Sequence, residues 1–177
     1  VVDLISYCEK SGKKIPFELQ TSVPNSGRYD SDTVQAMKVL SQLSYPYLKV
    51  QTSTQDCEQY LNFFKHGICL LLYDEKHYHD KFSGVTLDAF NNGCPVITAR
   101  NTWMGEQVLQ YHAGIVVDDY SPQTVLAALE NIIKNYVQFS VNATIAAEQL
   151  EKIHNPKYTL DLVTSVICQK KAEPISI

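Results

Sequence analysis

Short apolar runs alternate with segments of helical spacing along the chain, and this alternation is the feature that most constrains the fold. Five runs are typical of strands, and they cover residues 15–23, 47–53, 68–73, 95–99 and 113–119. Apolar residues in the segments between them recur every three or four positions, which is typical of helices. Strands joined by helices favour a parallel sheet. The sequence therefore predicts an α/β fold, a Rossmann-like parallel sheet with helices on both faces.

Local signals predict the domain limits and several helix ends. A first helix is expected to stop at Gly12, and Thr54 and Ser121 are expected to cap later helices. The remaining expected features are a turn at 24–31 followed by a helix capped by Asp30 or Ser31, and helices near 106–111, 141–153 and 157–168. We expect one domain over 1–169 and a polar tail over 170–177. Because the chain opens without Met and directly with a helical pattern, we expect it to be part of a longer protein.

Composition narrows the class of protein. The net charge of −4 argues against nonspecific nucleic-acid binding, which needs a basic surface. No apolar run reaches bilayer-spanning length, so we expect no transmembrane segment. The five cysteines are scattered and odd in number, which favours reduced thiols. We therefore expect a cytoplasmic protein, with peripheral attachment to a membrane left open.

The stretch "DKFSGVTLDAFNNGCPVI", residues 80–97, is the candidate site. It follows the apolar run at 68–73, and ligands of open α/β sheets bind at the carboxyl ends of strands. The amides of Ser83, Gly84 and Val85 would open a helix and suit an anion. Asp80 and Asp88 flank them and can accept hydrogen bonds from hydroxyls. Acids near a helix start are also favoured by the helix dipole alone, so a purely structural role stays open.

This stretch resembles the signature of the group 1 glycosyltransferases, retaining enzymes of the GT-B fold, which typically read E-G-F-G-x-x-x-x-E-A-x-x-x-G-x-P-V-I. The two acids fall on Asp80 and Asp88, and the aromatic falls on Phe82. The positions that also coincide are Ala89, Gly93, Pro95, Val96, Ile97 and, downstream, Glu106. The resemblance implies that the chain is the C-terminal, donor-binding half of such an enzyme.

The resemblance also implies roles for individual residues. Asp88 would bind the ribose of a UDP- or GDP-linked sugar, and Asp80 would bind the transferred sugar. Amides of residues 82–85 would hold sugar and diphosphate, Lys81 would add a positive charge beside the reacting centre, and Val50 and Thr52 would line the base pocket. The donor is a substrate, and no cofactor or metal is implied. The acceptor, a glycan, lipid or protein, would be bound with an N-terminal GT-B domain, and activity is expected to need that domain.

The chain departs from the family pattern at several positions. Both acids are Asp instead of Glu, Lys81 and Ser83 replace two glycines, and Thr102 and Trp103 replace a glycine pair. A non-catalytic partner or stabilising subunit is therefore an alternative, and a sugar-nucleotide epimerase of the same fold is a weaker one.

Two smaller features leave alternatives open. Trp103 can stack on a sugar or simply pack. The pair His77 and His79 is more typical of a loop than of a metal site, because no third ligand is apparent.

Overall fold

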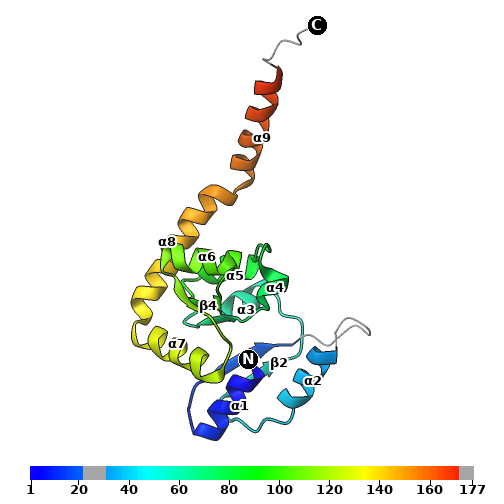
Figure 1. The fold of residues 1–177 in the computed structure, drawn as a ribbon, viewed down its shortest axis with the longest axis vertical. Helices are drawn as coiled ribbons and strands as arrows, with labels where there is room; N and C mark the ends of the chain where they lie inside the picture. Colours follow the sequence, from blue (N-terminus) through cyan, green and yellow to red (C-terminus); the bar gives the residue numbers. More distant parts are fainter. Residues whose placement is uncertain (22–30, 172–177) are drawn as a thin grey trace.

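The computed structural model describes residues 1–21 and 31–171, with side chains up to 164, and confirms the α/β class (Figure 1). Each predicted strand is present within its predicted range. The strands are β1 (Phe17–Gln20), β2 (Leu48–Gln51), β3 (Cys69–Leu71), β4 (Val96–Ala99) and β5 (Gly114–Val117). All their pairings are parallel. The predicted turn at 24–31 lies outside the described residues except for Ser31, where α2 (Ser31–Leu40) begins.

The strands form two sheets and not the single sheet that the sequence predicts. β1 pairs with β2, whereas β3, β4 and β5 form a separate sheet in that order. β1 and β3 are each paired on one side only. The continuous apolar run at 68–73 predicts a strand buried on both faces, and this is wrong: Cys69 and Leu70 are half-buried, because β3 is an edge strand.

Helices cover both faces of the sheet that contains β4. Neighbouring residues of a strand point to opposite faces, and Val96 and Ile97 belong to different hydrophobic clusters. On the Ile97 side lie α1 (Val2–Ser11) and α7 (Pro122–Lys134). On the Val96 side lie α5 (Gly84–Asn91), α6 (Trp103–Tyr111) and α8 (Tyr136–His154).

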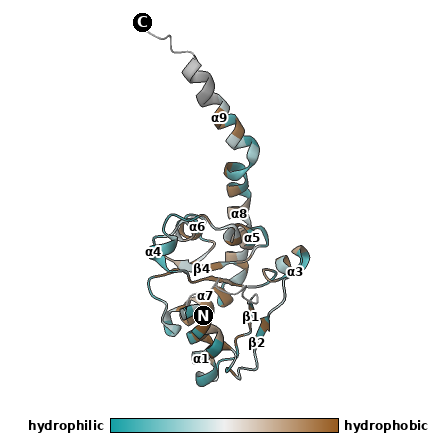
Figure 2. Ribbon diagram, turned by 90° about the vertical axis from the view of Figure 1, so that its right-hand side faces the viewer, coloured by the Kyte–Doolittle hydropathy of each residue, from teal (hydrophilic) through white to brown (hydrophobic). Residues whose placement is uncertain are grey.

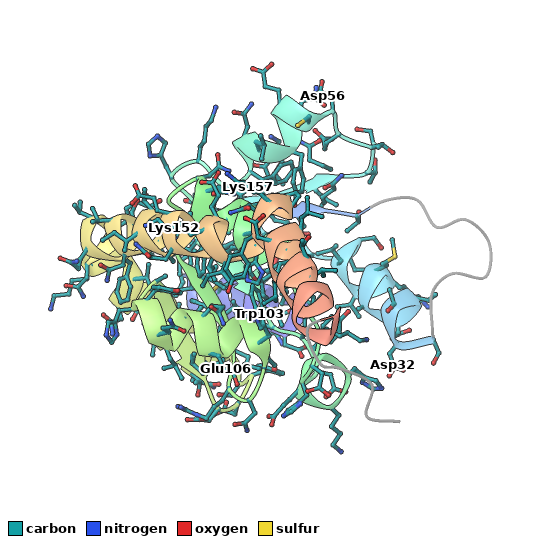
Figure 3. The ribbon with its side chains drawn as sticks, turned by 90° about the horizontal axis from the view of Figure 1, so that it is seen from above. Asp32, Asp56, Trp103, Glu106, Lys152 and Lys157 are labelled. Atoms are coloured by element: carbon teal, nitrogen blue, oxygen red, sulfur yellow. The ribbon has the colours of Figure 1, made fainter. Side chains whose placement is uncertain are left out.

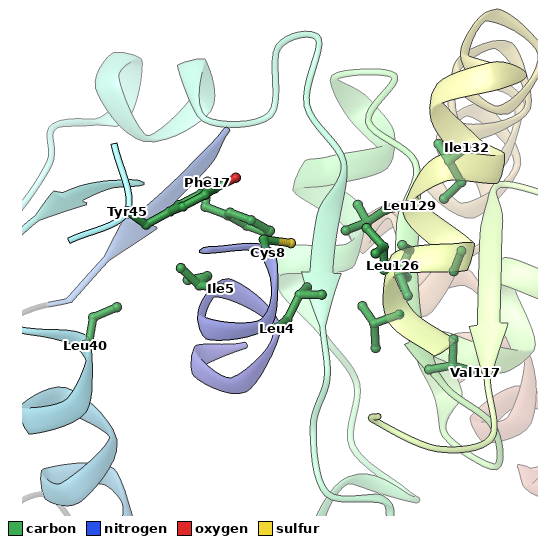
Figure 4. Packing of buried hydrophobic residues seen from close by; sticks show 13 residues of the cluster. Leu4, Ile5, Cys8, Phe17, Leu40, Tyr45, Val117, Leu126, Leu129 and Ile132 are labelled. Carbon is green, nitrogen blue, oxygen red and sulfur yellow. The ribbon is translucent and has the colours of Figure 1, made fainter. Parts of the chain in front are cut away.

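The cluster on the Ile97 side also extends to the second sheet. Phe17 of β1 packs in the same cluster as Leu4 of α1 and Leu129 of α7 (Figure 4). The two sheets are therefore held to each other by one shared core, although no strand pairing joins them.

Capping residues explain most helix ends. Gly12 follows α1 with φ 68°, in the predicted left-handed conformation. Ser121 caps α7 and Pro122 occupies its first turn, as predicted. The prediction that Thr54 caps the next helix is wrong. α3 (Cys57–Asn62) is capped by Asp56, which forms a reciprocal capping box with Gln59.

The last helices leave the body of the molecule. α8 packs against α5 and α6, and α9 (Pro156–Lys171) then projects away from the body (Figure 1). Apolar residues recur along this projecting helix (Figure 2). α9 is longer than the predicted 157–168 and includes the first residues of the predicted tail. No helix in the described part of the chain is long and apolar enough to cross a membrane.

Candidate functional site

The carboxyl ends of β3, β4 and β5 meet at one edge of their sheet, where the sequence predicts the site. Arg100 follows β4, and its guanidinium binds the Asp118 carboxylate after β5. Tyr120 donates a hydrogen bond to the carbonyl of Tyr73, after β3. A cavity of about 350 Å³ opens there, and it is lined by Asp74, Glu75, Lys76, Ala99, Val117, Asp118, Asp119 and Tyr120. The hydrogen bond from Arg100 holds the pKa of Asp118 below its ordinary value.

The loop 74–83 contains a short helix that the sequence analysis did not predict. Asp74 caps α4 (Glu75–Tyr78) and accepts a hydrogen bond from the amide of Lys76 at 3.0 Å. The His77 imidazole lies 2.7 Å from the same carboxylate and is the main cause of a lowered Asp74 pKa. The ammonium of Lys81 lies 4.7 Å from the centre of the Tyr78 ring, a cation–π contact.

The start of α5 is built as the sequence predicts, with one amide already used. The buried Ser83 hydroxyl accepts a hydrogen bond from the Thr86 amide at 3.2 Å. The amides of Gly84 and Val85 remain as the donors that the helix start offers. A Cβ atom placed on Gly84 would meet nothing within 4 Å, so this glycine borders open space.

The two predicted acids lie before and within α5 and differ in their surroundings. The Asp80 side chain is 92% exposed and lies 2.5 Å from His79 Nδ1. Asp88 is half-buried in the second turn of α5, where its carboxylate accepts a hydrogen bond from the Tyr60 hydroxyl at 2.9 Å. Burial and this hydrogen bond raise the pKa of Tyr60. No pattern in the sequence points to Tyr60 as the partner of Asp88, because Tyr60 lies 28 residues away on α3.

Three aromatic rings bring the starts of α5 and α6 together with the end of α8. Phe82 lies 4.5 Å from Trp103, between ring centres, and 5.2 Å from His154. Trp103 and the exposed Glu106 both belong to the first turn of α6, which Thr102 caps (Figure 3). Phe82 is 53% exposed. His154 gave no signal in the sequence, since it ends a helix more than 50 residues from Trp103.

The predicted base-pocket residues lie on the other sheet. Val50 is in β2 and Thr52 follows it, and both are exposed. Within the described residues, no hydrogen bond, ion pair or ring contact joins either of them to residues 80–83 or to Asp88. The structure thus groups residues 80–85 and Asp88 around α5, and it does not bring Val50 and Thr52 to them.

The described residues contain no group of three or more His, Cys, Asp or Glu placed to hold a metal ion. His77 and His79 each contact a carboxylate instead. The fold and this site define an α/β domain with an anion-suited helix start at the carboxyl edge of a parallel sheet. Comparison with protein families finds no family model that matches the chain, and no curated protein is significantly similar to it.

Proposed function

We propose that this chain is the nucleotide-sugar-binding domain of a retaining glycosyltransferase of the GT-B fold. The observation that carries the proposal is the meeting of two helix starts at the carboxyl ends of β3 and β4, where the rings of Phe82 and Trp103 are 4.5 Å apart. Helix starts carry partial positive charge and free amides, so this edge suits a diphosphate. The resemblance of residues 80–97 to the family signature supports a sugar attached to this diphosphate.

Each site residue would then have a binding role that follows from its chemical type. The amides of Gly84 and Val85 would bind the diphosphate and stabilise the charge that it gains as it leaves. Asp80, which is fully accessible, would accept hydrogen bonds from the sugar hydroxyls. Lys81 would add positive charge once it leaves the ring of Tyr78. The exposed face of Phe82 would contact the apolar face of the sugar ring.

In this proposal the Asp88 carboxylate accepts hydrogen bonds both from Tyr60 and from the ligand. One of its oxygens accepts the Tyr60 hydrogen bond, which fixes the carboxylate. A carboxylate has lone pairs for several donors, so it can still accept hydrogen bonds from a ribose diol. The acceptor, whether glycan, lipid or protein, would be bound with an N-terminal domain, and transfer by these 177 residues alone is not expected. We also propose that the protein is cytoplasmic.

Binding of donor sugars tests the proposal directly. The melting temperature of the 177-residue chain is measured with UDP- and GDP-linked hexoses, with the free hexoses and nucleosides as controls. A ligand at 100 times its Kd stabilises a protein by about 2.7 kcal/mol, which is readily visible. Stabilisation by a nucleotide sugar but not by its parts is expected. No stabilisation by any nucleotide sugar would overturn the proposal.

A non-catalytic partner subunit is the second candidate, and a specific observation favours it. The Ser83 side chain, at a glycine position of the family signature, is buried and committed to capping α5. Asp80 and Asp88 both already have partners within the chain. Hydrolysis of a bound donor by the intact protein, with its N-terminal domain, separates the candidates, because a partner subunit would bind weakly or not at all and would release no sugar.

A further inference from the structure

A cavity of about 500 Å³ lies between the two sheets, and it follows the edges of β1 and β3. All four residues of β1 and all three of β3 line it. Side chains of a strand alternate between its faces, so a face would contribute only every second residue. Consecutive residues on both sides therefore mean that strand edges, with their main-chain groups, form the two walls. We call this cavity the inter-sheet groove.

On the β1 wall, the main-chain groups of Glu18 and Gln20 point into the groove. The amide of Phe17 donates to the carbonyl of Tyr47, just before β2, and the amide of Thr21 donates to the carbonyl of Gln51 at the end of β2, at 2.8 Å each. Main-chain direction alternates along a strand, so Leu19 also faces β2, whereas Glu18 and Gln20 point away from it. Among the described residues β2 is the only strand that pairs with β1, so the main-chain groups of Glu18 and Gln20 have no strand partner there.

On the β3 wall, the same alternation places the main-chain groups of Leu70 in the groove. The Cys69 amide donates to the Pro95 carbonyl at 2.8 Å, and the Leu71 carbonyl accepts from the Thr98 hydroxyl of β4 at 3.0 Å. Leu70 lies between them and points away from β4. Its N–H and C=O have no strand partner in the described part of the chain, since β3 pairs only with β4 there, although Leu70 is half-buried. Such groups carry a free-energy cost that a hydrogen-bonding occupant removes.

Apolar side chains close the groove on its other two sides. Leu129 and Ile133 of α7 line one side, and Phe64, Val85 and Cys94 line the opposite one. An occupant must therefore offer main-chain donors and acceptors along both edges and apolar side chains toward both faces. A central strand of a parallel sheet has this character.

We propose that the inter-sheet groove binds an extended, apolar segment of polypeptide from outside these 177 residues, which pairs with β1 and β3 and joins the two sheets. The paired part is about four residues long, the length of β1. β-branched side chains suit it, because they favour extended backbone. A small apolar ligand would leave Glu18, Gln20 and Leu70 unpaired.

Residue-resolved amide exchange by NMR tests the pairing on the 177-residue chain. The probe is a synthetic peptide of alternating valine and isoleucine, flanked by lysines for solubility. Its control has the same sequence with every second amide N-methylated. We expect the unmethylated peptide to slow exchange at Glu18, Gln20 and Leu70. Leu19 is the internal reference, since its amide faces β2 and should change little.

Substitutions at the groove distinguish main-chain pairing from nonspecific binding of an apolar peptide. Gln20→Pro removes an amide that faces the groove and leaves the bonds to β2 intact, and Gln20→Ala is its matched control. We expect the proline variant to bind the peptide about three- to tenfold more weakly than the alanine variant, as for one lost hydrogen bond. Ile133→Glu adds a second test at a position that is 54% exposed, where the fold tolerates charge, and it should also weaken binding.

Three outcomes would overturn the proposal. The first is equal affinity for the peptide and its N-methylated control. The second is protection that does not alternate along β1. The third is formation of a dimer by light scattering, with protection at Glu18 and Gln20 in the absence of peptide, which would assign the groove to a second copy of this chain.

Discussion

The hydroxyl of Tyr60 donates a hydrogen bond to the carboxylate of Asp88 at 2.9 Å and thereby ties α3 to α5. The bond therefore joins α3 to the helix whose start would bind the diphosphate. Because Asp88 is half-buried, its carboxylate is fixed by this contact before any ligand arrives. Preorganisation of this kind lowers the entropy cost of binding a ribose diol.

The first prediction separates a binding role of Asp88 from a structural one. Asp88→Asn should weaken nucleotide-sugar binding about tenfold or more, because one charge-assisted hydrogen bond contributes about 1.5–3 kcal/mol. Tyr60→Phe is the matched variant: it removes the internal hydrogen bond to Asp88 but keeps the carboxylate. Calorimetry should show much weaker binding for the first and only a small loss for the second, which loses the preorganisation but keeps the charge. If both variants lose stability and neither loses affinity, the acid serves the fold alone.

The second prediction concerns the open space at Gly84. Gly84→Ala should leave the fold intact or stabilise it, since alanine is about 1 kcal/mol better than glycine in a helix and its Cβ meets no atom within 4 Å. Nucleotide-sugar affinity should nevertheless fall, because the new methyl group lies where the diphosphate would approach. Gly105→Ala is the contrast, as its Cβ would lie 2.4 Å from the Ala99 carbonyl oxygen and should destabilise the fold. Unchanged affinity in Gly84→Ala would argue against diphosphate at this helix start.

The third prediction uses Trp103, the only tryptophan of the chain, as a fluorescent reporter. Phe82→Ala should shift its emission to longer wavelength, because the Phe82 ring shields it from water. Stability should change little, since Phe82 is 53% exposed. Leu109→Ala, at an exposed position of the same helix, is the control and should leave the emission unchanged. A shift of equal size in both variants would mean that Phe82 does not shield the indole.

The fourth prediction concerns the ion pair between Arg100 and Asp118. The pKa of Asp118 is lowered in the folded chain, chiefly by the hydrogen bond from Arg100, so the pair stabilises the fold at pH above the ordinary Asp pKa of 3.8. That stability is lost as the pH falls from 3.8 through the lower folded-state pKa. Asp118→Asn should therefore lower the melting temperature slightly at pH 7 and not at the lowest pH.

The expected change in melting temperature is limited by the exposure of the two side chains. Both side chains are largely exposed, so the difference should be small and should shrink in high salt. Arg100→Gln should behave in the same way, and the double variant should add nothing further. A difference that persists once Asp118 is protonated would assign the effect to something other than the pair.

Much of the fold could be predicted because it depends on local patterns. Apolar runs such as 68–73 and 95–99 identify strands, and Ser121 with Pro122 identifies the start of α7. The cap of α3 is also encoded locally, because Gln59 lies three residues after Asp56 and completes a capping box, whereas Cys57 holds that position after Thr54. This spacing favours Asp56 over Thr54.

The separation into two sheets and the composition of the site were harder to predict, since both depend on long-range contacts. The pattern of β1 and β3 predicts strands but does not say whether they pair with each other. The carboxylate of Asp88 and the hydroxyl of Tyr60 come from different helices, and His154 reaches Phe82 from the end of α8. The positions of Val50 and Thr52 follow from the separation of the sheets and not from their own residue types.

The shared core between the two sheets has a consequence for how the molecule unfolds. β1 and β2 are held to the rest of the described chain through side chains such as Phe17, and no ladder of strand hydrogen bonds has to break for them to detach. Hydrogen-bonded sheets open cooperatively, whereas side-chain contacts can be lost in a separate step. Denaturation should therefore pass through a state in which β3, β4 and β5 keep α5, α6, α7 and α8 while β1 and β2 have already detached.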